Sequence, residues 1–180
     1  MTIYFTADTH FSDPRVLAID RRPFPSLEAH DAALVALWRE TVRDDDVVWH
    51  LGDFARDRPA GRAAAILAQL TGEKHLILGN NDPDSVARDP GWASVRHYAE
   101  IAVDGQRLVL CHYPFRTWRD SGKGVIDLHG HSHGRLTPIP RQYDVGVDVW
   151  DHRPVTLETI RARRRRGPPR PPPARESASP

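Results

Sequence analysis

Five short polar clusters, far apart along the chain, carry side chains that commonly bind metal ions. The clusters are Asp8-Thr9-His10, Gly52-Asp53, Gly79-Asn80-Asn81-Asp82, Cys111-His112 and Gly130-His131-Ser132-His133. The candidate ligands are two carboxylates, one amide oxygen and four imidazoles, from Asp8, His10, Asp53, Asn80, His112, His131 and His133. Mixed oxygen and nitrogen ligands suit Mn²⁺, Ni²⁺, Fe²⁺, Co²⁺ or Zn²⁺ better than Mg²⁺ or Ca²⁺. Because seven ligands exceed one tetrahedral site, the set predicts two divalent ions that share one carboxylate.

Each cluster directly follows an apolar run with the composition of a β-strand. The strands that we expect before the clusters are 2–7, 47–51, 74–78, 107–111 and 125–128. In layered α/β folds, ligands gather at the carboxyl ends of strands, where residues distant in sequence converge. The pattern therefore predicts a single site built from five loops.

Two amphipathic helices are expected between the first three strands. The first covers 27–43, with Ser26 suited to cap its N-terminus. The second begins at Pro59 and ends before Gly72. Strands that alternate with helices are typical of a layered α/β sheet.

The later part of the chain changes to hairpins. Strands over 95–103 and 107–111 flank Asp104-Gly105, a strong signal for a β-hairpin with a two-residue loop. A last strand is expected over 142–149 and a closing helix over 154–163. We expect one domain over residues 1–163. The Arg- and Pro-rich segment 164–180 cannot bury a core and is expected to be a disordered tail.

The composition is that of an ordinary globular protein, with 180 residues, 39% hydrophobic and 27% charged. The single cysteine, Cys111, excludes an intrachain disulfide. No run approaches the roughly 20 apolar residues of a membrane span, and no secretory signal is visible. We therefore expect a cytoplasmic protein with no membrane partner. The arginines at 163–166 could contact nucleic acid, or could belong to a solvated tail without a partner.

The order of the clusters resembles the signature of the calcineurin-like metallophosphoesterase superfamily. The resemblance spans residues 2 to about 160, and the opening Thr6-Ala7-Asp8-Thr9-His10-Phe11 is similar to that of small bacterial phosphodiesterases and phosphohydrolases of this superfamily. It implies a layered α/β/β/α sandwich, in which helices flank two mixed sheets. It also implies a metal-dependent phosphoesterase that acts on a phosphoester substrate.

The resemblance implies a role for each ligand. A first ion would be held by Asp8, His10, Asp53 and His133. A second ion would be held by Asp53, Asn80, His112 and His131, so that Asp53 bridges the two. A hydroxide between the ions would attack phosphorus, since two divalent cations lower the pKa of a shared water toward neutrality. We expect Mn²⁺ before the other ions.

Asn81 departs from the family's pattern, which usually has His at this position. In the family that His contacts the phosphate and protonates the leaving oxygen, oriented by the acid that follows, here Asp82. An amide cannot deliver a proton, and a positioned general acid is worth about 10²–10⁴-fold in rate. We therefore expect phosphodiesters to be favoured over monoesters. Asn81, Asp82 and Asp53 would be the catalytic residues, and Asn81 and Arg15 would bind the phosphate.

A binding scaffold with little or no catalysis is the alternative hypothesis, because a missing His at 81 is compatible with it. The filled ligand set favours the enzyme. Three questions stay open at this point. His50 or His129 could orient a ligand imidazole, and Arg22 could join Arg15 at the phosphate.

Overall fold

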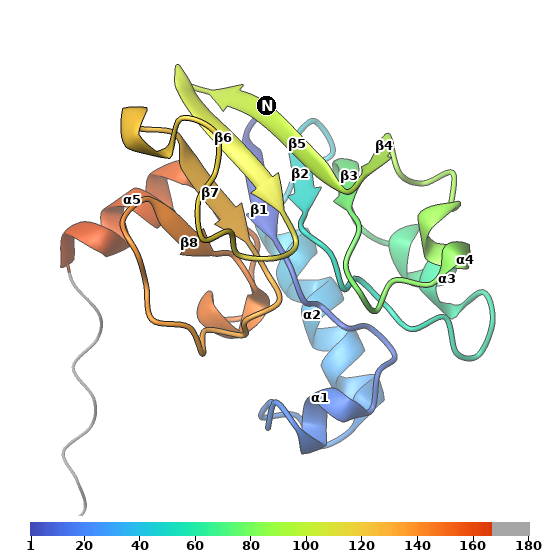
Figure 1. Ribbon diagram of the computed structural model, residues 1–180. Helices are drawn as coiled ribbons and strands as arrows, with labels where there is room; N and C mark the ends of the chain where they lie inside the picture. The colour runs from blue at the N-terminus through green and yellow to red at the C-terminus, as the bar shows by residue number, and fades with distance from the viewer. Residues whose placement is uncertain (167–180) are drawn as a thin grey trace, which may run out of the picture.

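A computed structural model describes residues 1–166, with side chains described as far as Arg163. Two β-sheets pack face to face, and helices lie outside them (Figure 1). The first sheet has the order β4-β3-β2-β1-β9, from Ser94–Arg96, Glu73–Ile77, Val47–His50, Ile3–Thr6 and Val155–Thr156. The second has the order β5-β6-β7-β8, from Tyr98–Val103, Gln106–Cys111, Ile126–His129 and Gln142–Asp144.

Both sheets are mixed. Strands β1 to β4 are parallel and β9 runs antiparallel to β1, whereas β5 is antiparallel in a sheet whose other strands are parallel. The helices are α1, α2, α3, α4 and α5, over Arg15–Ala18, Leu27–Thr41, Arg62–Leu67, Asp84–Ala87 and Leu157–Arg166. Short 3-10 turns, η1 and η2, cover Ser121–Lys123 and Val147–Val149. The predicted sandwich of two mixed sheets flanked by helices is confirmed.

Two apolar layers hold the fold together, because successive side chains of a strand point to opposite faces. On β2, Val48 packs with α2 and α3, while Trp49 faces the second sheet. On β3, Leu76 and Ile77 divide in the same way. Both faces of the first sheet are therefore buried, as expected for parallel strands.

Several local predictions are confirmed. Helix α2 follows its N-cap at Ser26, whose Oγ accepts a hydrogen bond from the Ala29 N–H at 3.1 Å. The hairpin between β5 and β6 turns at Asp104-Gly105, and both residues have positive φ, as a type I′ turn requires.

The expected strand over 95–103 is wrong as a single element. Its first part, β4, pairs with β3 in the first sheet, while β5 pairs with β6 in the second. The chain changes sheets at His97. Two strands in different sheets look continuous in sequence, because each alternates in the same way.

Three other boundaries differ from the predictions. The strand expected over 142–149 ends at Asp144, whose Oδ1 accepts the Gly146 N–H at 2.7 Å and so turns the chain into η2. The closing helix starts at Leu157, since the two residues before it pair with β1. Helix α3 is shorter than expected and begins after Gly61 instead of at Pro59.

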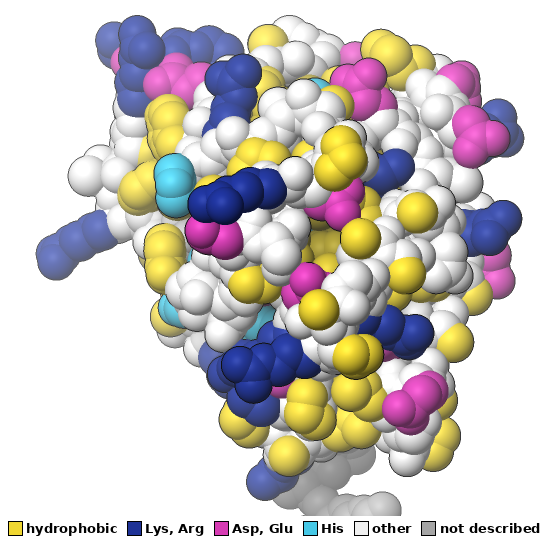
Figure 2. Space-filling model, turned by 90° about the vertical axis from the view of Figure 1, so that its right-hand side faces the viewer, with side chains coloured by type: hydrophobic (Ala, Val, Ile, Leu, Met, Phe, Trp, Pro, Cys, Tyr) yellow, Lys and Arg dark blue, Asp and Glu magenta, His cyan; other side chains and the backbone are white. Residues whose placement is uncertain are grey.

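Helix α5 continues through Arg166, three residues beyond the predicted domain boundary. The rest of the predicted tail, 167–180, lies outside the described residues. Of the arginines suggested to contact nucleic acid, 163–166, the side chains at 164–166 also lie outside the described part. Among residues 1–166, no helix is long and apolar enough to cross a membrane. On the face that carries α3 and α4, basic and acidic side chains are interspersed (Figure 2). That face therefore offers no extended patch of one charge sign.

Candidate metal centre

The five polar clusters meet at the carboxyl ends of β1, β2, β3, β6 and β7. Backbone hydrogen bonds join the loops directly: Asp8 N–H donates to Gly52 O at 2.9 Å, and His10 N–H donates to Asp53 O at 3.0 Å. The Gly130 N–H likewise donates to His112 O at 3.0 Å. The loops are thus held by their own main chains, independently of any ligand.

Asp53 lies at the centre of the candidate ligands. Its Oδ2 is 3.6 Å from Nε2 of His10 and 3.5 Å from Nε2 of His112. Asn80 Oδ1 is 3.1 Å from the same nitrogen of His112. Ligands about 2.0–2.2 Å from a shared ion lie roughly 3–4 Å from one another. The spacing around Asp53 suits a metal centre.

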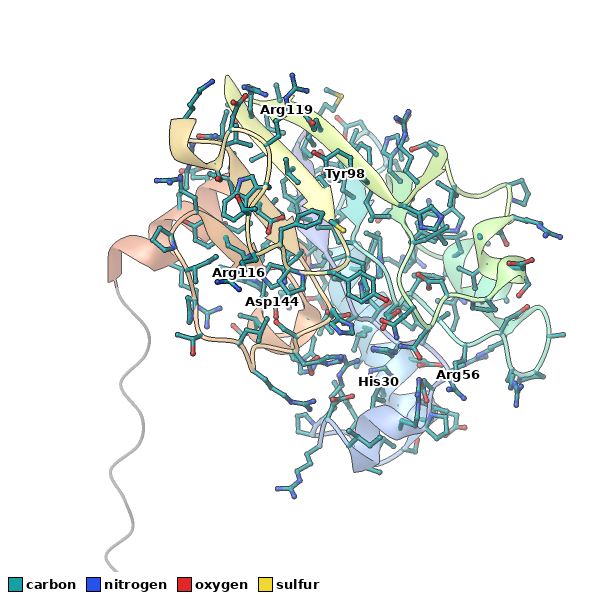
Figure 3. The ribbon with its side chains drawn as sticks, viewed as in Figure 1. His30, Arg56, Tyr98, Arg116, Arg119 and Asp144 are labelled. Atoms are coloured by element: carbon teal, nitrogen blue, oxygen red, sulfur yellow. The ribbon has the colours of Figure 1, made fainter. Side chains whose placement is uncertain are left out.

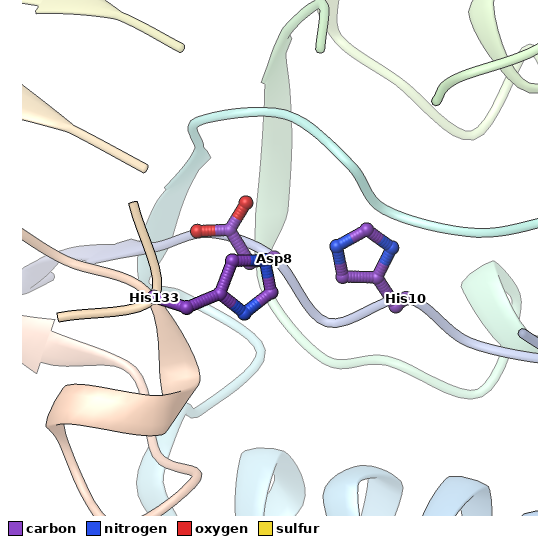
Figure 4. A group of neighbouring side chains, drawn as sticks. All are labelled: Asp8, His10 and His133. Carbon is purple, nitrogen blue, oxygen red and sulfur yellow. The ribbon is translucent and has the colours of Figure 1, made fainter. Parts of the chain in front are cut away.

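Two groups of three potential ligand atoms each lie within 4.8 Å of one another. One is Asp8, His10 and His133, which converge from two separate segments of the chain (Figure 4). The other is Asp8, Asp53 and His112. His131 joins through its backbone N–H, which donates to both oxygens of Asp8 at 3.0 and 2.9 Å, and its ring lies 5.1 Å from that of His112.

The other ring nitrogen of two histidines is bound to a neighbouring group. Nδ1 of His112 donates to Leu51 O at 2.8 Å, and Nδ1 of His133 pairs with Asp148 Oδ2 at 2.7 Å. Such partners fix the tautomer and turn Nε2 toward the site. Sequence reasoning missed both partners, because one is a backbone carbonyl and the other comes from a distant 3-10 turn.

Nε2 of His10 is buried and has no hydrogen-bond partner within residues 1–163. A buried polar atom without a partner is costly. A cation at this point would remove that cost, and the donor set of the site therefore fits a divalent ion.

The imidazoles of His10 and His112 have a charge state that suits a cation. Burial lowers the pKa of His10 to about 4 and lowers the pKa of His112. Both imidazoles are therefore neutral at pH 7 and offer a lone pair. Burial raises the pKa of Asp8. Burial would also raise the pKa of Asp53, but His112, His10 and hydrogen bonds from Asn81 outweigh it and lower the pKa.

The backbone at the site is unusual. Five of the seven predicted ligands have positive φ: Asp8 (56°), His10 (49°), Asp53 (57°), His131 (67°) and His133 (47°). Residues other than glycine rarely adopt this backbone conformation, and strained backbone of this kind is common at functional sites. Glycines let the strained loops approach, since a Cβ on Gly79 would lie 2.2 Å from Oδ1 of Asp53.

Asp82 connects the loops through their backbones. Its Oδ2 accepts the N–H groups of Gly79 at 2.8 Å and Asp53 at 2.9 Å, and its Oδ1 accepts that of Phe54 at 2.7 Å. Burial raises its pKa to about 6, so the group is mostly ionised at pH 8. The Asn81 side chain bonds to Asp53 and Arg15, and not to Asp82. The geometry thus gives Asp82 a bracing contact with the loop of Asp53.

Asp82→Asn is expected to lower the free energy of unfolding by about 1–3 kcal/mol, because the new NH₂ group faces N–H donors and leaves one unpaired. In a chain of this size the melting temperature should fall by roughly 3–10 °C. Thermal unfolding at pH 8 measures the change, with the exposed Asp84→Asn as the matched control. An unchanged melting temperature with lost hydrolysis would instead assign Asp82 a chemical role.

Asn81 and Arg15 lie at the mouth of the site. Asn81 Nδ2 donates to Asp53 Oδ2 at 2.7 Å, and its Oδ1 accepts from Arg15 Nη2 at 2.9 Å. Arg15 pairs with Asp13 but keeps 41% of its side chain exposed. It borders a cavity of about 200 Å³ together with His10, Asp53 and Asn80. Arg135, which sequence reasoning missed, borders the same cavity.

Arg22 has a different position. Its side chain is only 1% exposed, and it donates to Asp8 O, to Thr9 O and to Asp148. It supports the ligand loop from behind, and it does not line the cavity that Arg15 borders. His50 and His129 bond to Thr9 Oγ1 and Gly130 O, and neither bonds to a ligand imidazole.

The sequence model of the calcineurin-like phosphoesterase family matches residues 1–171. The chain belongs to this family. The predicted resemblance is confirmed, and this calcineurin-like phosphoesterase is a metal-dependent phosphoesterase whose family uses divalent metal ions.

Relatives of this phosphoesterase come from phages and archaea. It is 32% identical over 190 residues to the gene 66 protein of Mycobacterium phage D29. This alignment covers 88% of this chain and 94% of the relative. It is 30% identical over 166 residues to an uncharacterized protein of Methanocaldococcus jannaschii, with 88% of each covered. A solved structure of a protein of unknown function from Aquifex aeolicus shares the fold, with a TM-score of 0.69 and 20% identity over 89% of this chain and 97% of that one.

Proposed function

We propose that this phosphoesterase hydrolyses phosphodiesters in preference to monoesters, at a centre of two divalent ions, with Mn²⁺ the first candidate. The observation that carries the preference is the environment of Asn81. Both polar atoms of its side chain bond within the site, to Asp53 and Arg15, and neither can release a proton. Substrates whose leaving groups depart without protonation are therefore favoured. Activated aryl diesters are of this kind, and in cyclic phosphates the strain of the ring helps the leaving oxygen to depart.

Two sets of residues would hold the ions. The first is Asp8, His10, Asp53 and His133, and the second is Asp53, Asn80, His112 and His131. When bound, such ions supply a water nucleophile of lowered pKa and neutralise charge on the phosphoryl oxygens.

The chain's own part is positioning. The carboxylate of Asp53 lies between two neutral imidazoles, those of His10 and His112. The Arg15 guanidinium and the Asn81 amide offer N–H donors at the mouth of the site for the phosphate oxygens.

A metal and substrate panel tests the proposal. The metal-stripped chain is loaded with Mn²⁺, Ni²⁺, Fe²⁺, Co²⁺ or Zn²⁺, and bound metal is quantified. Hydrolysis of bis(p-nitrophenyl) phosphate, p-nitrophenyl phosphate and 2′,3′-cyclic nucleotides is then compared. We expect a higher kcat/KM for the diesters. Equal or higher values for the monoester with every metal contradict the preference. No turnover by metal-loaded protein on any substrate supports the binding scaffold.

Arg15→Gln is expected to raise KM for the aryl diester about tenfold, as the loss of one charge-assisted hydrogen bond worth about 1.5 kcal/mol predicts. The fold should survive, because Asp13 keeps a second partner in Arg56, whose Nε lies 3.2 Å away. Steady-state kinetics measure the change. Arg88→Gln, which alters an exposed pair on α4, is the control. An unchanged KM argues that Arg15 does not touch the substrate.

A further inference from the structure

A second cavity, of about 320 Å³, adjoins the cavity at the candidate metal centre. Asp20, His133 and Arg135 border both cavities, so the two share one wall. His133 is a candidate metal ligand, and Arg135 follows it by two residues. A molecule bound at the metal centre therefore lies next to the second cavity.

Charged side chains of both signs line the second cavity: Arg21, Arg22, Arg135, Asp20 and Asp148. The exposure of each group decides which charge a ligand meets. Arg21 is exposed, and the side chain of Arg135 is 60% exposed. The carboxylates are mostly covered, because the side chain of Asp20 is 10% exposed and that of Asp148 is 15% exposed. The accessible charge in this cavity is therefore positive.

Arg22 has no donor left for a ligand. Its five N–H groups donate to Asp8 O, to Thr9 O, to His30 Nε2 and to both carboxylate oxygens of Asp148. A guanidinium has five donors in all, so these contacts use every one of them. The pair of Arg22 and Asp148 is therefore a fixed part of the wall.

Arg135 and Arg21 keep free donors. Arg135 Nη2 donates to Asp20 Oδ1 at 2.7 Å, and within residues 1–163 its guanidinium has no other partner. In the same part of the chain, no hydrogen bond or ion pair is found for the side chain of Arg21. Because both side chains border the cavity, their N–H groups are available to an anion there.

The backbone that carries Arg135 is held in place. Its N–H donates to Ser132 O at 2.9 Å. Asp144, labelled in Figure 3, accepts at Oδ2 from Ser132 Oγ at 2.5 Å and from Gly134 N–H at 2.8 Å. The base of the Arg135 side chain is thus positioned before a ligand arrives, which lowers the entropic cost of binding.

We propose that the second cavity binds a further phosphate group of the substrate, with Arg135 and Arg21 as the donors. A guanidinium can present two parallel N–H groups to phosphate oxygens, and two guanidinium groups suit a phosphate dianion. The substrate class is then a phosphodiester that carries a second phosphate group, such as a phosphorylated nucleotide. This inference rests on the proposed hydrolysis of phosphodiesters, and binding without turnover tests it separately.

Two aryl diesters with the same leaving group test the proposal. One is thymidine 5′-(p-nitrophenyl phosphate), and the other is the same ester with a phosphate at the 3′ position. With the full chain loaded with Mn²⁺, we expect kcat/KM to be about tenfold higher for the 3′-phosphorylated ester, the factor that one charge-assisted hydrogen bond gives. The advantage should shrink at high ionic strength, because salt screens exposed charges. Equal values, or a lower value for the phosphorylated ester, would overturn the proposal.

Calorimetric titration with thymidine 3′,5′-bisphosphate and thymidine 5′-phosphate gives a readout that needs no turnover. We expect the bisphosphate to bind about tenfold more tightly. A binding preference without hydrolysis of either ester would support the phosphate site and contradict the proposed function. Hydrolysis without a binding preference would overturn the phosphate site alone.

Variants of the two arginines identify the donors. Arg135→Gln and Arg21→Gln should each lower the ratio of the two kcat/KM values several-fold, and Arg135→Lys, which keeps the charge, should retain part of it. Arg88→Gln, at an exposed position on α4, is the control and should leave the ratio unchanged. If Arg135 acts only through Asp20 and His133, its loss changes both esters alike. A ratio that survives Arg135→Gln therefore contradicts the assignment.

Discussion

Replacing Asp53 with Asn is expected to lower kcat/KM for an activated aryl diester by about 10³-fold or more. Asp53 is the candidate bridging ligand, and its Oδ2 faces Nε2 of both His10 and His112. A neutral amide at this position would weaken the binding of both ions of the proposed centre at once. A loss of several kcal/mol of charge stabilisation corresponds to this factor.

Asp53→Asn should add no strain to the backbone at this position. Asn tolerates the left-handed conformation found there, with φ of 57°. Asp104→Asn is the matched control, since Asp104 is exposed and also has positive φ, 49°. Kinetics with Mn²⁺ should be paired with a measurement of bound metal. Full activity in Asp53→Asn, with two ions still bound, would show that Asp53 is not a ligand of the centre.

Replacing Asn81 with His is expected to raise kcat/KM for monoesters with basic leaving groups by at least about tenfold. The new imidazole would stand beside Asp53 and Arg15, where the amide now stands, and could protonate the leaving oxygen. A fully positioned general acid is worth about 10²–10⁴-fold, and an introduced one should reach only part of this.

The dependence of rate on the leaving group gives the sharpest measurement. Across a series of aryl and alkyl phosphates, kcat/KM should fall less steeply with leaving-group pKa in Asn81→His than in the parent. Asn81→Ala, which removes the amide without adding an acid, is the control and should show no flattening. If Asn81→His and Asn81→Ala behave alike on every substrate, position 81 does not face the leaving group.

The candidate site shows which of its features can be predicted from local sequence and which cannot. The predicted ligands lie together because each follows a strand, and strand ends in one layered fold meet at one edge. The partners that orient the ligands could not be predicted in this way. Leu51 O and Asp148 reach His112 and His133 through the packing of loops, which no spacing rule encodes.

Arginines give a second example. Arg15 and Arg22 look equivalent in sequence, yet one side chain is 41% exposed and the other 1%. Arg22 becomes buried because the backbone carbonyls of Asp8 and Thr9 and the carboxylate of Asp148 take its donors. Only the fold decides which guanidinium is free for a ligand.

The amino-acid sequence by itself predicted a layered α/β sheet and the chemical types of the candidate ligands, because these depend on periodicity and on residue types at strand ends. The order of the five clusters carried the resemblance that implied the family and its sandwich of two sheets. The tertiary structure decided where the strand predicted over 95–103 divides between two sheets. It also placed Asp82 among three backbone N–H groups and formed the cavity between Arg21 and Arg135. These features arise from contacts between residues distant in sequence, which appear only when the two sheets and their loops pack together.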